Sequence, residues 1–78
     1  MVAIHKINKI EFVNNYMIIN IDGNELKISL EKLSIKLRNA TKIERTIYKI
    51  SPTGYGIHWP LIDEDLSIEG IIRDFVSS

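Results

Sequence analysis

The apolar and polar positions of the first thirty residues are typical of three β-strands separated by short turns. A first strand is expected over residues 2–12, although Ile7 lies out of phase with the other apolar positions. A bulge near Lys6 would restore the register. Residues 16–21 form a nearly continuous apolar run, which predicts a central strand covered on both faces or nearly so.

Two short turns separate these strands. Asn14-Asn15 favours a turn because asparagine tolerates positive φ, and Asp22-Gly23 is a preferred two-residue hairpin turn. Residues 25–30 then alternate with period two, which predicts a half-buried antiparallel strand. Its expected core-facing residues are Leu26, Ile28 and Leu30.

The period then changes to that of a helix. The apolar residues on one helical face are Leu30, Leu33, Leu37 and Ala40. This spacing predicts a short helix over residues 31–39, ended by Asn39. Thr41 and Glu44 match a capping box, so a second helical turn is expected to begin there.

A second hairpin is expected after this helical segment. Residues 46–50 return to strand composition, and residues 51–54 form a turn around Pro52. Tyr55 to Trp59 is the returning strand. It should end at Trp59, because Pro60 cannot donate a ladder hydrogen bond.

The C-terminal residues predict a connection followed by a helix. Asp63-Glu64-Asp65 reads as a polar loop, and Ser67 is a good N-cap. The apolar residues that follow at helical spacing are Ile68, Ile71, Ile72 and Phe75. The order is therefore β-β-β-α-β-β-α, with antiparallel hairpins packed against two short helices. This pattern defines an α+β fold in one domain over residues 1–78.

Composition narrows the possible functions. Ten basic and ten acidic residues give zero net charge, which argues against nucleic-acid binding by the isolated domain. The absence of cysteine excludes disulfides, iron–sulfur clusters and thiolate zinc sites. No signal-peptide core is visible, and no apolar run approaches the ~20 residues of a membrane span. We expect a cytoplasmic protein that does not enter a membrane.

The segment from Gly54 to Ile72 resembles a known family. Its Gly56-Ile57-His58-Trp59-Pro60 run, followed by Asp63-Glu64-Asp65-Leu66-Ser67, is similar to the C-terminal signature of the small bacterial domain-of-unknown-function family 2442. Asp22-Gly23 and the strand after it match the family's N-terminal hairpin. The resemblance implies a compact α+β domain without assigned catalytic residues. It also implies a protein partner, because members are often encoded beside another small domain, as in toxin–antitoxin pairs.

Few residues suggest catalysis or metal binding. Asp63-Glu64-Asp65 is better explained as a solvated loop, with Asp65 favouring the positive end of the last helix, than as a metal site. His5 and His58 could meet, and with a carboxylate bind a metal, if the first strand paired with the Tyr55–Trp59 strand, but nothing in the spacing requires this pairing. No serine lies in a nucleophile-elbow motif. We therefore expect no enzyme activity, no metal and no cofactor.

The candidate interaction surface lies in the C-terminal signature. It comprises Tyr55, His58, Trp59, Asp63, Glu64 and Asp65. An alternative is that nucleic-acid bases stack on Tyr55 and Trp59, but the zero net charge argues against it. We predict instead that Trp59 is buried against the last helix and that its indole N–H finds one partner.

Three functions from different classes remain. The preferred one is a non-catalytic protein-interaction or regulatory module, which binds a toxin-like protein or a second copy through a sheet edge. The alternative is a small DNA-associated regulator, whose basic residues would be Lys32, Lys36, Arg38 and Lys42. A metal-dependent or hydrolytic enzyme is the least favoured.

Overall fold

The structure is a computed structural model and describes residues 5–76. Its elements are β1 (Ile7–Val13), β2 (Tyr16–Ile21), β3 (Asn24–Ser29), α1 (Leu30–Leu33), α2 (Ile35–Arg38), α3 (Lys42–Thr46), β4 (Lys49–Ile50), β5 (Gly56–Trp59), β6 (Glu64–Ser67) and α4 (Ile68–Phe75). The α+β class and the predicted order of strand and helix blocks are confirmed. Residues 2–4 of the expected first strand lie outside the described residues.

The first sheet is antiparallel and has the order β1-β2-β3. The β1–β2 register shifts between Ile7 and Lys9, so the predicted bulge exists slightly beyond Lys6. Asp22 and Gly23 have φ of 53° and 88°, as the predicted hairpin turn requires. The expectation that β2 is covered on both faces or nearly so is met on one face and only partly on the other, where Ile18 and Asn20 are half-buried. Its residues alternate, with one face buried and the other ending at an exposed Tyr16.

The single helix expected over residues 31–39 is two helices. Ser34 separates α1 from α2 with an extended backbone, at φ −163° and ψ 115°. Its hydroxyl accepts from the Leu37 backbone N–H as the N-cap of α2, and donates to the Glu64 carboxylate of β6. This contact between residues 30 positions apart explains why the helical period alone missed the break. The Thr41–Glu44 capping box is confirmed at the start of α3.

The second sheet has the order β4-β5-β6 and one strand more than predicted. The expected strand over residues 46–50 is reduced to β4, because α3 extends to Thr46. The expected polar connection at residues 63–65 is wrong for two of its members: Glu64 and Asp65 belong to β6, which pairs with β5. The strand end at Trp59 is confirmed.

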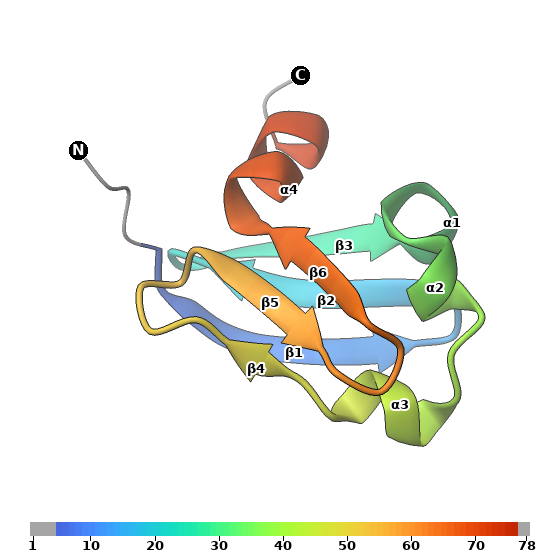
Figure 1. Cartoon of the computed structure of the whole chain (residues 1–78). Coiled ribbons are helices and arrows are strands. Elements are labelled where there is room, and N and C mark those ends of the chain that lie inside the picture. Colours follow the sequence, from blue (N-terminus) through green and yellow to red (C-terminus); the bar gives the residue numbers. More distant parts are fainter. Residues whose placement is uncertain (1–4, 77–78) are drawn as a thin grey trace.

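The core lies between the two sheets, which Figure 1 shows as two layers with β4–β6 in front of β1–β3. Its buried residues are Met17, Ile19, Ile21, Ile28, Leu30, Leu37, Ile57, Trp59, Ile68 and Ile71. Trp59 has no exposed surface, which confirms its predicted burial. Its ring packs against Phe12 and Tyr48 at centroid distances of 6.5 and 6.0 Å, and its indole N–H donates to the Arg45 carbonyl at 3.0 Å.

Helix α4 begins as predicted at Ser67. The Ser67 hydroxyl accepts from the Gly70 backbone N–H and caps the helix. Ile68 and Ile71 face the core cluster that also contains Trp59. No helix within residues 5–76 has both the length and the apolar character to cross a membrane.

Candidate interaction surfaces

The outer surface of the second sheet carries a groove of about 560 Å³. We call this surface the β5 face. Its residues are Lys49, Ile50, Ser51, Pro52, Tyr55, Gly56, Ile57, His58, Asp65, Leu66 and Ser67. Tyr55 is 58% exposed, so its aromatic ring is open to solvent here. Gly56 lets β6 approach closely, since a Cβ at this position would lie 3.1 Å from the Leu66 carbonyl oxygen.

Three polar side chains form a row across the β5 face. Lys49 of β4 and Asp65 of β6 are both cross-strand partners of His58 of β5. The His58 and Asp65 side chains meet at 2.7 Å between Nδ1 and Oδ1. Because an ionised carboxylate can only accept, His58 Nδ1 donates this hydrogen bond. The row therefore has a cation at one end and an anion at the other.

The β5 face contains half of the predicted surface residues. Tyr55, His58 and Asp65 line its groove. Trp59 instead belongs to the core. Asp63 lies in the β5–β6 turn with φ 50°, and its carbonyl accepts from Lys36.

Glu64 is also directed away from this groove, toward Ser34. Sequence reasoning missed Lys49, Ile50, Pro52 and Leu66 as lining residues. The alternation of Glu64-Asp65-Leu66-Ser67 is a strand pattern that would have placed Leu66 on the inner side and Asp65 on the outer side of a sheet.

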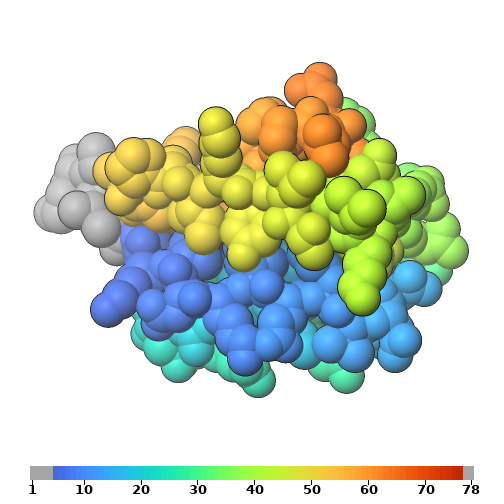
Figure 2. All heavy atoms as spheres, turned by 90° about the horizontal axis from the view of Figure 1, so that it is seen from below, coloured from blue at the N-terminus to red at the C-terminus, as the bar shows by residue number. Residues whose placement is uncertain are grey.

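A second groove of about 600 Å³ lies between β1 and α3. We call it the β1 groove. It is lined by Ile10, Glu11, Phe12, Asn14, Lys42, Arg45, Thr46 and Tyr48. Figure 2 shows this face, with β1 in blue next to the yellow-green segment that contains α3 and β4. In the same segment of the chain, Ile43 and Ile47 are 69% and 44% exposed.

One side of the β1 groove is an open strand edge. Among residues 5–76, β1 pairs only with β2. A two-residue hairpin closes on a hydrogen-bonded pair, here Val13 with Tyr16, and the bonded pairs then alternate. The backbone N–H and C=O groups of Ile10 and Phe12 therefore point away from β2 and toward the open edge.

Arg45 holds the other side of the β1 groove in place. Its guanidinium donates to the carbonyls of Leu37, Asn14 and Arg38 at 2.9–3.1 Å. Its Cζ lies 5.7 Å from the centroid of the Phe12 ring. The Arg45 cation joins α3, α2 and the β1–β2 turn and so fixes the width of the groove. Because its partners are neutral carbonyls, the positive charge of Arg45 remains in the lining of the groove.

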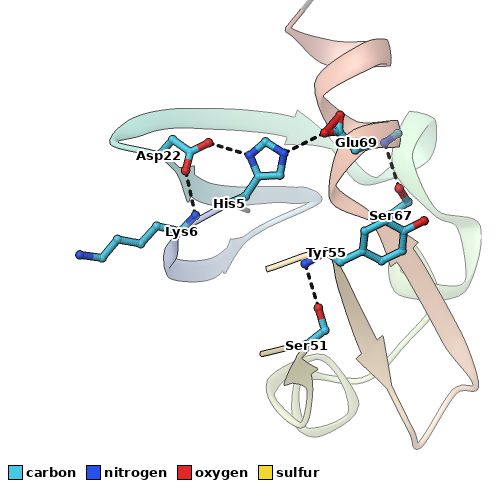
Figure 3. Close-up of polar contacts among 8 residues, drawn as sticks. His5, Lys6, Asp22, Ser51, Tyr55, Ser67 and Glu69 are labelled. Carbon is cyan, nitrogen blue, oxygen red and sulfur yellow. Dashed lines mark hydrogen bonds and ion pairs between the residues drawn. The ribbon is translucent and has the colours of Figure 1, made fainter. Parts of the chain in front are cut away.

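A third feature, the His5 cluster, joins three distant segments. Figure 3 shows His5 between Asp22 of the β2–β3 turn and Glu69 of α4. The two ring nitrogens lie 2.7 and 2.9 Å from the carboxylate oxygens. When both carboxylates are ionised they can only accept, so this geometry suits a ring that donates from both nitrogens, which is the imidazolium form.

The pKa values of His5 and Asp22 shift in the directions that favour their charged forms. Hydrogen bonds to Asp22 and then to Glu69 raise the pKa of His5 above 6.5. The hydrogen bond from His5, followed by that from the Lys6 backbone N–H, lowers the pKa of Asp22 below 3.8. The cluster is thus a structural ion network that ties the N-terminal segment to α4.

The two histidines do not meet. β1 and β5 belong to different sheets, and each imidazole bonds to its own carboxylates. Two of the four basic residues considered for DNA binding have partners within the protein. Lys36 donates to the Asp63 carbonyl, and Arg38 pairs with Glu31. Within residues 5–76, no group of three or more His, Asp or Glu side chains is arranged so that it could hold a metal ion.

Fold and grooves together define a small α+β domain whose described surface carries the β5 face and the β1 groove. The model of one family matches residues 7–77, nearly the whole chain. The chain belongs to this family, which is described as "Protein of unknown function (DUF2442)". The resemblance of the C-terminal signature is therefore confirmed. No curated protein and no solved structure matches the chain.

Proposed function

We propose that this protein is a non-catalytic interaction module that binds a partner protein in the β1 groove. The observation that carries the proposal is the open edge of β1 beside an apolar groove of about 600 Å³. Exposed strand edges present rows of unpaired N–H and C=O groups, which pair readily with an added strand. The N–H and C=O groups of Ile10 and Phe12 are available for this pairing.

The lining of the groove selects the chemistry of the partner segment. An added strand turns alternate side chains toward the groove, where Phe12 and Tyr48 offer apolar contacts. Lys42 and Arg45 supply positive charge, whereas the Glu11 carboxylate is paired with Lys9 at 2.6 Å. The partner segment is therefore extended, apolar at alternate positions, and acidic at the end near α3.

The family resemblance suggests a biological role for this binding. The partner would be a small toxin-like protein encoded beside this one, which the domain neutralises in the cytoplasm. Burial of the partner segment against β1 would hold that protein in an inactive complex.

Co-expression with the protein of the adjacent gene tests the proposal. We expect a tagged chain to capture that protein and to relieve the growth defect it causes. Ile10→Pro removes an outward-pointing N–H without breaking the ladder to β2, and should weaken capture about tenfold. Lys42→Glu reverses a groove charge and should weaken it two- to tenfold, roughly.

The matched control is Lys27→Pro on the other open edge of the first sheet. By the same alternation, the Lys27 N–H points away from β2, so the backbone change is equivalent but remote from the groove. If Lys27→Pro reduces capture as much as Ile10→Pro does, that result would contradict the β1 groove as the binding site. Capture of DNA instead, weakening steeply with salt, would favour the DNA-associated regulator.

A further inference from the structure

The β5 face presents opposite charges on either side of its central strand. Lys49 makes no ion pair with another described residue. The Asp65 side chain is 75% exposed, and among its contacts with described residues only Oδ1 is bonded, to His58. Adjacent strands are ~4.8 Å apart, so the Lys49 and Asp65 backbones are ~10 Å apart with His58 midway. Both charged ends therefore have free bonding capacity.

This charge order distinguishes between the ways in which two such faces can meet. A two-fold axis parallel to β5 and above His58 places Lys49 of each copy opposite Asp65 of the other. An axis across the strands instead places lysine against lysine and aspartate against aspartate. Facing like charges repel, so only the parallel axis gives a complementary contact.

We infer that the β5 face is a self-association surface and that a second copy of this chain covers it, with the two-fold axis parallel to β5. Two Lys49–Asp65 pairs form across the interface. The exposed side chain of Tyr55 supplies its apolar part. This inference does not depend on the proposed function, which uses the β1 groove.

The dimer leaves the β1 groove accessible. The β5 face is directed toward the viewer in Figure 1, whereas the groove lies on the face seen in Figure 2 after a rotation of 90°. Each dimer then presents two partner-binding edges, because neither surface contributes to the lining of the other.

Charge reversal and its rescue test the inference by sedimentation equilibrium. Lys49→Glu or Asp65→Lys places like charges opposite each other at both contacts, and should raise the dimer dissociation constant on the order of tenfold or more. The double variant K49E/D65K restores opposite charges at both contacts. We expect it to dimerise within about threefold of the wild type. Lys32→Glu, an equal charge change on α1, should leave the dissociation constant unchanged.

The outcomes separate this dimer from other assemblies. A wild-type chain that stays monomeric up to ~1 mM overturns the inference, since that limit corresponds to negligible affinity. A dimer whose dissociation constant is unchanged in both single variants also overturns the inference, because such a dimer must use another surface. Failure of the double variant to recover, with circular dichroism showing a folded chain, would exclude this axis. None of these results changes the expectation for capture through the β1 groove.

Discussion

The β1 groove and the β5 face have similar volumes, about 600 and 560 Å³, but different chemistry. The β1 groove has unpaired backbone groups along one side and a net positive lining. The β5 face offers side chains only, because its central strand is paired on both sides, and its charges are balanced in one row. An open edge suits a strand of another protein, whereas a balanced row suits a second copy.

The two surfaces also share a structural support. Trp59 belongs to the central strand of the β5 face, and its ring packs against Phe12 and Tyr48, which line the β1 groove. Changes at Trp59 should therefore affect both surfaces, whereas changes in the 51–55 loop or at the His5 cluster should affect only one side of the molecule.

The largest effect is expected for Trp59→Ala. Truncation of a buried aromatic residue should lower the free energy of unfolding by about 3–5 kcal/mol and weaken binding at both surfaces. Trp59→Phe keeps the ring but leaves the Arg45 carbonyl without its N–H donor, so it should cost only about 1–2 kcal/mol. Urea denaturation measures both. A loss below about 1 kcal/mol in the alanine variant would contradict the buried position.

A smaller effect, limited to the β5 face, is expected for Gly54→Ala. A Cβ at Gly54 would lie 1.8 Å from the His5 carbonyl oxygen, and φ is 67°. Strain and displacement of the 51–55 loop should cost about 2–4 kcal/mol. Gly23→Ala is the matched control. Its φ is 88° but no atom lies within 4 Å, so it should cost only about 1–2 kcal/mol. Equal losses in thermal melts would show that the His5 contact is unimportant.

The smallest effect is a pH dependence from the His5 cluster. Because the folded-state pKa of His5 is raised, its contribution to stability is complete below 6.5 and is lost as pH rises through the raised value. Asp22 behaves oppositely: its contribution is present above 3.8 and is lost as pH falls through the lowered value.

Melting temperatures at about pH 6 and about pH 9 check the His5 contribution. We expect the wild type to melt lower at the higher pH. This decrease should shrink in His5→Gln and persist in His58→Gln, which removes the other imidazole. An identical decrease in all three proteins would assign the pH dependence to other groups.

Much of the fold follows from signals that lie within a few residues of each other. The Asp22-Gly23 hairpin, the Thr41–Glu44 capping box and the Ser67 cap were each predictable, because the atoms that bond are three or four positions apart. The interaction surfaces were predictable only in part. Tyr55, His58 and Asp65 line one groove, whereas Trp59, which was also in the candidate surface, is buried as its predicted core position requires.

What remained was decided by contacts between distant residues. Ser34 interrupts the helix because its hydroxyl is shared between Leu37 and Glu64, and β6 exists because residues 64–67 find β5 as a partner. The β1 groove exists because α3 packs beside a strand that ends 29 residues before the helix begins. The sequence by itself determined the hairpins, the caps and the family. Only the tertiary structure decided which strand edge stays open and which charges share a row, because these depend on how the two sheets pack over a common core.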